Sequence, residues 1–243
     1  MIRNLLCWVV LAFVVVSCDK SYVTPDPVAR GLNFYPLEVG DYRIYNVKDI
    51  KYQHNEPTEL NFQMREWVVD SFMDQTNTLT YKIIRSIRPN AESQWEDDSV
   101  MTVTKNQSMV ILTKDNTRYV KLVFPVEEGK TWLGDMYNDH DIVDDPNPNI
   151  SKETYTYKSL DQPFEVGNLS FEKTVVVEQG SQGLFNSKLS DGIEVYARGV
   201  GRVYRLFDRK VYEDCSPEYC PQGEGYILDG HKREEVLIEH GKL

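Results

Sequence analysis

The chain has 243 residues, a formal charge of −11 at neutral pH and an aromatic content of 12%. So acidic a chain is poorly suited to bind nucleic acid or an anionic membrane surface, because both attract basic patches. Its apolar content of 41% excludes a disordered polymer, and its length is sufficient for one substantial core.

The first 17 residues have the pattern of an export signal. Arg3 is the one charged side chain before an apolar run at residues 5–16. As a helix this run would be about 18 Å long, well short of the roughly 30 Å hydrocarbon core of a bilayer. A basic start, a short apolar run and small residues after it predict a cleaved signal peptide at residues 1–17.

Cys18 follows this segment in the sequence Val15-Val16-Ser17-Cys18, which resembles the lipobox of bacterial lipoproteins. The resemblance implies cleavage before Cys18 and attachment of lipid, including an acyl chain such as palmitate, to that residue. Two or more acyl chains form a stable anchor, because each buried CH₂ contributes about 0.8 kcal/mol. The sequence therefore predicts lipidation of Cys18; the alternative is an ordinary signal peptide with an incidental cysteine.

Residues 18–32 are expected to hold the lipidated cysteine and a tether, since they contain two prolines and no apolar periodicity. A flexible chain of this length spans roughly 20 Å, so the following domain would lie just off its membrane. We expect that membrane to be the outer membrane of a Gram-negative cell envelope. Asp19 is followed by Lys20, which leaves the periplasmic and the surface face both open.

A single β domain is expected at residues 33–243. Alternation of apolar and polar residues, rich in Val, Ile, Thr and Tyr, predicts strands at 42–47, 60–67, 79–83, 101–104, 119–123 and 154–157. Polar turns are expected at 74–77, at 115–116 and at Asp191-Gly192, and residues 232–239 fit either a last strand or a short helical turn. The spacing predicts an all-β fold, an antiparallel meander curved into a sandwich or an open barrel.

One segment of the domain is repeated. YPLEVG at residues 35–40 returns 89 residues later as FPVEEG at residues 124–129. In each copy a proline blocks pairing where a strand begins, and a glycine permits a tight turn before the next strand. This predicts two related β-units, 33–123 and 124–243, that share one core; chance similarity is the alternative.

These two segments, extended to residues 34–42 and 124–132, and YARGVGRV at residues 196–203 carry a family resemblance. They resemble landmarks of a large group of uncharacterised β-rich lipoproteins from Bacteroides-like Gram-negative bacteria. The resemblance covers most of the mature chain and implies an envelope lipoprotein without defining its role. That group commonly places a tryptophan after the first glycine, where this chain has Arg43, so the first unit is expected to pack differently.

Cys215 and Cys220 are the cysteines that remain once Cys7 leaves with the signal peptide and Cys18 is lipidated. The Ser216-Pro217 between them favours a turn that brings the two sulfurs together. In an oxidising compartment this predicts a local disulfide, which would contribute about 2 kcal/mol. Free thiols and a metal site are the alternatives, although four intervening residues do not match a redox motif.

The sequence contains no recognisable catalytic pattern: no nucleophile elbow, zinc-protease helix or phosphate-binding loop. The acidic pairs Asp97-Asp98 and Glu127-Glu128 are adjacent, and adjacent residues of a strand point to opposite faces. Residues 135–149 are rich in Asp and Asn and could offer oxygen ligands to calcium, but a solvated connection explains them more simply. Asp98-Ser99-Val100 resembles an O-glycosylation acceptor of the same bacteria, and modification of Ser99 is left open. We predict no catalytic residue, metal or cofactor.

The sequence therefore predicts a non-catalytic accessory or interaction module, anchored to the envelope through lipid on Cys18. Its partner would be another envelope protein or a glycan, and its oligomeric state is left open. Two alternatives are a carrier that holds an apolar ligand in a curved sheet and a glycan-acting enzyme. An unfilled apolar concavity would favour the carrier, and two buried carboxylates about 5–9 Å apart across a cleft would favour the enzyme.

Overall fold

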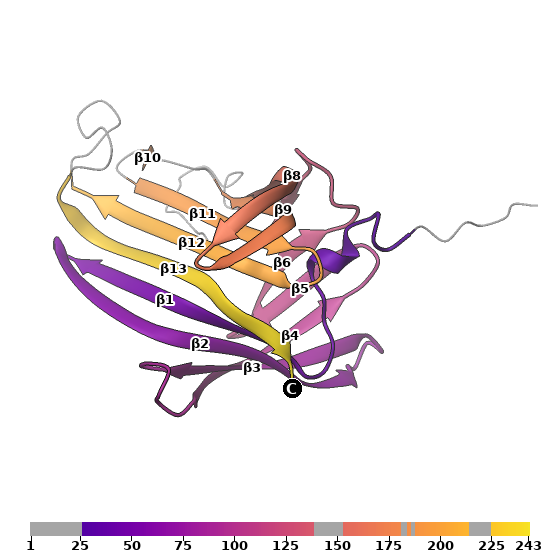
Figure 1. Ribbon diagram of the computed structural model, residues 1–243. Coiled ribbons are helices and arrows are strands. Elements are labelled where there is room, and N and C mark those ends of the chain that lie inside the picture. Colours follow the sequence, from indigo (N-terminus) through magenta and orange to yellow (C-terminus); the bar gives the residue numbers. More distant parts are fainter. Residues whose placement is uncertain (1–25, 139–152, 181–183, 186–187, 214–224) are drawn as a thin grey trace, which may run out of the picture.

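The computed structural model describes residues 26–138, 153–180, 184–185, 188–213 and 225–243. These residues form one short 3-10 helix and thirteen strands (Figure 1). The helix is η1 (Leu32–Phe34) and the strands are β1 (Asp41–Gln53), β2 (Glu56–Met73), β3 (Leu79–Arg88), β4 (Glu96–Lys105), β5 (Met109–Lys114), β6 (Thr117–Val123), β7 (Thr131–Leu133), β8 (Thr154–Val166), β9 (Leu169–Gln179), β10 (Leu184–Phe185), β11 (Lys188–Ala197), β12 (Gly201–Tyr212) and β13 (Ile227–Lys242).

All thirteen strands belong to one antiparallel sheet. Their order is β6-β5-β4-β3-β2-β1-β13-β12-β11-β9-β8-β7, and β10 pairs with β11. Most neighbours in the sheet are also consecutive in the chain, and the pairing of β1 with β13 joins the two halves. The predicted all-β antiparallel meander is confirmed, and of its two expected forms the structure has the open barrel (Figure 1).

The two halves of the chain share one apolar core. Apolar side chains from both halves pack in the interior of the curved sheet, and β-bulges bend several strands around them. This cluster consists of Leu32, Phe34, Leu37, Val68, Ile83, Met101, Val103, Val110, Val120, Leu122, Phe124, Val126, Trp132, Tyr155, Tyr157, Val175, Val177 and Tyr196. That the halves descend from related units stays a prediction.

The gap between the edge strands β6 and β7 is bridged by a mixture of side-chain and backbone hydrogen bonds. Trp132 on β7 donates its indole N–H to the carbonyl of Val120 at 2.8 Å, and the Val120 N–H reaches the Gly134 carbonyl at 2.7 Å. The hydroxyl of Tyr157 accepts from the Val123 N–H at 2.9 Å and donates to its carbonyl at 2.8 Å. These bonds occupy part of an edge that would otherwise expose unpaired backbone groups.

Asn138 completes this closure farther along β6. Its side-chain oxygen accepts from the Arg118 N–H at 3.0 Å, and its amide nitrogen donates to the Arg118 carbonyl at 2.7 Å. The amide thus makes the pair of bonds that a neighbouring strand would make. The barrel is therefore nearly closed without a continuous backbone ladder at this seam.

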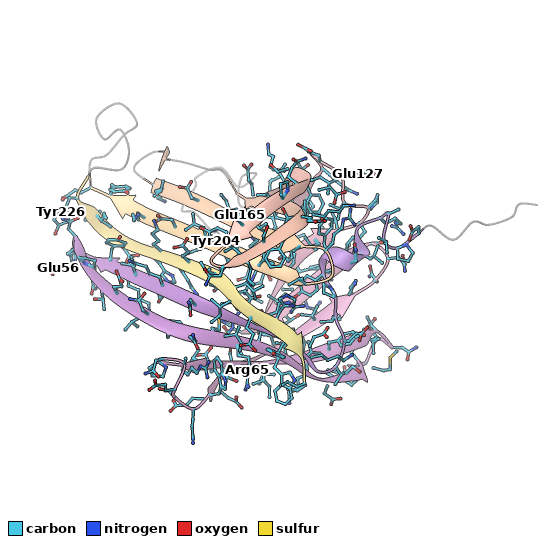
Figure 2. The ribbon with its side chains drawn as sticks, in the orientation of Figure 1. Glu56, Arg65, Glu127, Glu165, Tyr204 and Tyr226 are labelled. Carbon is cyan, nitrogen blue, oxygen red and sulfur yellow. The ribbon has the colours of Figure 1, made fainter. Side chains whose placement is uncertain are left out.

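The β8–β9 hairpin bends back over the outside of the barrel. Ser159 and Asp161 take positive φ angles of 50° and 54°, where the pairing of β8 with β9 is irregular. Beyond this bend, the ring of Phe164 lies 5.8 Å from that of Tyr204, and a Cβ atom on Gly167 at the hairpin tip would lie 3.6 Å from Val236. Figure 2 shows Glu165 of this hairpin beside Tyr204 of β12. The hairpin therefore covers part of the outer face of β12 and β13, and its Val166 belongs to a second apolar cluster that also includes Val195 and Val203.

Three expectations from the sequence concerned turns and an ambiguous strand, and one of them is wrong. The expected turn at Asp191-Gly192 is wrong, because both residues lie inside β11. Gly192 is needed there for close approach, since a Cβ atom would lie 3.0 Å from the Gln179 side chain. The ambiguous segment 232–239 is strand throughout. The tight turns expected at Gly40 and Gly129 are confirmed by their positive φ angles of 99° and 79°.

We expect Tyr157→Phe to destabilise the fold by about 1–3 kcal/mol, because it leaves two part-buried backbone groups of Val123 without their partner. Chemical denaturation measures this loss. Tyr226→Phe is the matched control, since it removes one hydrogen bond from an exposed hydroxyl to His54. Equal effects of the two substitutions would contradict the importance of the seam.

Candidate functional site

The interior of the barrel contains a group of charged side chains contributed by six different strands. We call this group the interior ion-pair network. Its members are Glu66 of β2, Arg85 of β3, Lys121 of β6, Glu194 of β11, Arg202 and Arg205 of β12, and Arg233 and Glu235 of β13. The side chains of Glu194 and Glu235 are essentially inaccessible to solvent. Buried charges of this kind persist only when they are paired.

Glu194 lies where three cations converge. Its Oε1 is 2.7 Å from the Lys121 ammonium, 3.5 Å from Arg205 Nε and 3.7 Å from an Arg202 nitrogen. Its Oε2 accepts a hydrogen bond of 2.6 Å from the hydroxyl of Tyr196. Both carboxylate oxygens are therefore engaged.

Arg202 joins the carboxylates of separate strands. Its Nη2 lies 2.8 Å from Glu235 and 3.1 Å from Glu66. Glu235 is in turn 3.1 Å from Arg205 and 2.7 Å from Arg233. A single guanidinium on β12 thus links β2, β11 and β13 across the interior.

The electrostatics of the network keep its carboxylates ionised. Burial alone would raise the pKa of Glu194, but Lys121, Arg202 and Arg205 lower that pKa to about 2. The pKa of Glu235 is likewise well below its ordinary value, since the surrounding arginines outweigh the effect of burial. Burial raises the pKa of Tyr35 to about 12, so this phenol stays protonated as a hydrogen-bond donor.

The network is not suited to acid–base catalysis. A glycosidase needs one carboxylic acid whose pKa is raised so that it can donate a proton. Glu66, Glu194 and Glu235 all have lowered pKa values and are held by guanidinium or ammonium groups. Among the described residues, these carboxylates therefore act as partners for cations.

A small cavity adjoins the network. Its volume is about 20 Å³, and charged and phenolic groups such as Arg43, Tyr45, Lys121 and Arg202 line it together with apolar side chains. This volume holds about one water molecule and no organic ligand. The apolar concavity that a carrier would need is not found at this cavity.

Two of the three segments that carried the family resemblance, 34–42 and 196–203, are joined through Arg43. Arg43, which follows the first turn glycine, donates from Nε to the Val200 carbonyl at 2.6 Å and from Nη2 to the Pro36 carbonyl at 3.1 Å. Gly201 has to be glycine here, because a Cβ atom would lie 2.8 Å from Arg43 Nε. Arg198 binds the side chain of Asn33 at 2.9 Å. Segment 196–203 is thus a structural junction.

The lipidation and disulfide residues predicted from the sequence, Cys18, Cys215 and Cys220, lie outside the described residues. The same is true of most of the acidic stretch 135–149. Of that stretch, Asp135 accepts a hydrogen bond from the Glu153 N–H and Asn138 binds β6, so both have structural partners. Calcium binding, the disulfide and the lipid all stay predictions.

The adjacent acids do not form a catalytic pair. Asp97 accepts a hydrogen bond from Ser86 at 2.8 Å, and Asp98 accepts one from Ser99 at 3.1 Å. The Glu127-Glu128 pair is exposed in the turn that precedes β7. Modification of Ser99 stays open.

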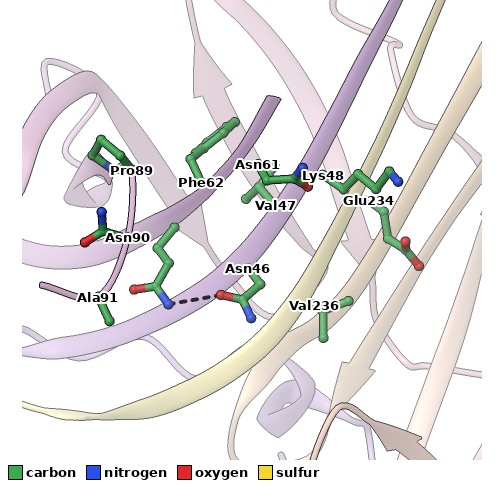
Figure 3. A pocket seen from close by; sticks show the side chains of 11 residues that line it. Asn46, Val47, Lys48, Asn61, Phe62, Pro89, Asn90, Ala91, Glu234 and Val236 are labelled. Atoms are coloured by element: carbon green, nitrogen blue, oxygen red, sulfur yellow. Dashed lines mark hydrogen bonds between the residues drawn. The ribbon is translucent and has the colours of Figure 1, made fainter. Parts of the chain in front are cut away.

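A second site lies on the outer face of the sheet. It is a groove of about 420 Å³ whose floor is formed by β13, β1 and β2 and whose wall is the β3–β4 loop (Figure 3). We call it the amide groove, because four of its lining residues carry side-chain amides. It is lined by Asn46, Val47, Lys48, Asn61, Phe62, Gln63, Pro89, Asn90, Ala91, Glu234 and Val236.

The polar groups of the amide groove form an ordered chain. Arg88 donates from Nε to the Gln63 side-chain oxygen at 2.8 Å. Gln63 donates from its amide nitrogen to the Asn46 side-chain oxygen at 3.0 Å, the bond drawn as a dashed line in Figure 3. Arg88 is itself stacked at 4.2 Å over the ring of Trp95, and Arg65 lies 4.9 Å from the same ring. Neither this groove nor the interior network was predicted from the sequence.

The described part of the chain has neither a metal-binding cluster nor a helix that could span a membrane. There, acidic, histidine and cysteine side chains do not gather in groups of three or more that could hold a metal. No helix of those residues is long and apolar enough to cross a membrane.

Comparison with known proteins gave one distant structural similarity. No family model and no curated protein matches the chain. A solved structure from Bacteroides fragilis NCTC 9343, assigned as an exported protein with a YmcC-like fold, aligns with 86% of this chain and 99% of its own at a TM-score of 0.35 and 10% sequence identity. A similarity of this size does not establish a common function.

We expect Glu235→Ala to destabilise the protein by about 3–5 kcal/mol, because it leaves Arg202, Arg205 and Arg233 facing one another without that carboxylate. Chemical denaturation provides the measurement. Glu127→Ala is the control at an exposed carboxylate (Figure 2) and should change stability by less than about 0.5 kcal/mol. A loss below about 1 kcal/mol for Glu235→Ala would show that the network is dispensable.

The network also predicts an acid-sensitive fold. The pKa of Glu194 is about 2 in the folded state, against an ordinary value of 4.5. The stability that its ionised form contributes is therefore present above about pH 5 and is lost as the pH falls toward 2. Unfolding curves measured at intervals of about one pH unit between pH 6 and 2 should show this loss. Glu194→Gln should reduce the dependence of the free energy of unfolding on pH and should lower that free energy at neutral pH. An unchanged acid dependence in that variant would assign the effect to other carboxylates.

Proposed function

We propose that this chain is an exported envelope lipoprotein, anchored through lipid on Cys18, whose β domain is a non-catalytic binding module. The observation that carries the non-catalytic part is the state of the interior carboxylates. Glu66, Glu194 and Glu235 have lowered pKa values and are all bound to cations, so none is poised to transfer a proton at neutral pH. The interior acts as a rigid support for the outer surface.

The tether and the fold support this proposal together. The described part of the chain begins at residue 26, within the predicted tether, and the buried Leu32 and Phe34 pack η1 onto the core. A lipid on Cys18 would then hold the barrel near a membrane while leaving its outer face accessible. The partner is another envelope component, a protein or a glycan, and the outer membrane is the expected site.

The two alternatives receive less support from the described residues. A carrier of an apolar ligand requires an interior volume far larger than the roughly 20 Å³ beside the network, since ligand sites usually measure about 300–1,000 Å³. A glycan-acting enzyme requires a protonated carboxylic acid beside its ionised partner. No specific observation favours either one.

Substitution of Cys18 by serine tests the anchor. We expect Cys18→Ser to abolish incorporation of labelled palmitate and to move the chain from the membrane fraction to the soluble fraction, because the acyl chains supply the membrane affinity. Cys7→Ser is the matched control within the signal peptide and should leave both properties unchanged. Labelling that survives in Cys18→Ser would place the lipid elsewhere or contradict the lipoprotein assignment.

A further inference from the structure

The amide groove and the interior ion-pair network lie on opposite faces of the same strands. It opens on the outer face, and its volume of about 420 Å³ falls within the usual range of ligand sites, about 300–1,000 Å³. Strand alternation explains its position, because Glu235 and Val47 point inward while Val236, Asn46 and Lys48 point outward. The network therefore fixes the same strands that form the floor of the groove.

The groove presents a chemistry suited to hydroxyl groups. Each side-chain amide both donates and accepts hydrogen bonds, as each sugar hydroxyl does. The Asn46 oxygen is occupied by Gln63, which leaves its amide nitrogen directed to solvent as a donor. The Asn90 oxygen is occupied by the loop residues Glu92 and Ser93, which leaves its amide nitrogen as a second donor.

Acceptors lie beside these donors. The Asn61 amide nitrogen is bound to Glu59 at 2.9 Å, so the Asn61 oxygen is available as an acceptor. Glu234 accepts from the Tyr204 hydroxyl at 2.8 Å through one oxygen and offers the other. Donors and acceptors are thus held in fixed positions before a ligand arrives, which reduces the entropic cost of binding.

The charge of the groove selects against ionic ligands. Lys48 and Glu234 are its charged lining residues and have opposite signs, and Lys48 is also paired with Glu59 at 3.1 Å. The protein as a whole carries a charge of −11, which disfavours acidic polymers. Between the polar groups, Pro89 and Val236 offer apolar surface that fits the C–H faces of sugar rings.

We propose that the amide groove binds a short segment of a neutral saccharide. This inference rests on the proposed binding role and gives it a ligand class. Asn46 and Asn90 donate to sugar hydroxyls, Asn61 and Glu234 accept from them, and Gln63 holds Asn46 in position through the chain that begins at Arg88. The bound sugar leaves chemically unchanged.

An oligosaccharide array tests the assignment. The full chain, extracted in detergent from its own host, is applied to neutral gluco-, manno- and galacto-oligosaccharides beside uronate-containing ones. We expect binding to neutral members, and Asn46→Ala should weaken that binding about tenfold because a hydrogen bond to the sugar is lost. Lys48→Ala should weaken it less, since Lys48 already pairs with Glu59.

Gln53→Ala is the matched control, since it removes an exposed amide from the same strand outside the groove. Thermal unfolding of each variant confirms that the fold is intact. The assignment is overturned if no neutral saccharide binds, if uronate-containing saccharides bind better, or if Asn46→Ala and Gln53→Ala behave alike.

Assay of new reducing ends in the same incubations separates this inference from the proposed function. Binding without cleavage supports both. Binding with cleavage would support saccharide binding by the groove and contradict the non-catalytic role. Absence of both binding and cleavage would contradict saccharide binding by the groove. It would not affect the proposal of an anchored, non-catalytic module, which the Cys18 substitution tests.

Discussion

The contacts of Arg202 with carboxylates on three other strands constrain the shape of the whole barrel. Glu66 lies on β2, Glu194 on β11 and Glu235 on β13, and each comes within 4 Å of this one guanidinium. A buried carboxylate that lost this partner would cost several kcal/mol. The sheet must therefore curve far enough to bring β2 and β11 around β12. Apolar packing alone tolerates many arrangements, whereas these charges require one.

The interior contacts of Arg202 also determine which side chains face outward and where they lie. Side chains of a strand alternate between its faces, so strands that are held on the inner face also have a fixed register on the outer face. Glu235 faces inward and its neighbour Val236 faces outward, beside Asn46 on β1. The floor of the amide groove is consequently as rigid as the network behind it. The β8–β9 hairpin and the β3–β4 loop then add structure above that floor.

Much of the fold was accessible from the sequence, because it depends on local alternation and on turn residues. All six segments predicted as strands lie within strands of the sheet. The interior network was not predicted, because polar residues of a strand ordinarily face solvent. A signal was present: Arg233 and Glu235 alternate along β13 on the side of the interior. The groove could not be predicted, since Asn46, Gln63 and Asn90 meet only after distant segments fold together.

Arg43 and Trp132 occupy matching positions, each three residues after a turn glycine. Trp132 follows the second turn glycine and donates its ring N–H to the Val120 carbonyl. Arg43 follows the first turn glycine at the same spacing and donates its Nε–H to the Val200 carbonyl. Each side chain thus anchors the start of its half to a backbone carbonyl of another segment. The guanidinium, however, needs space where a Cβ atom of residue 201 would stand, so Arg43 requires Gly201. The two positions are therefore expected to depend on one another, because a larger residue at 201 would displace the arginine that joins this junction.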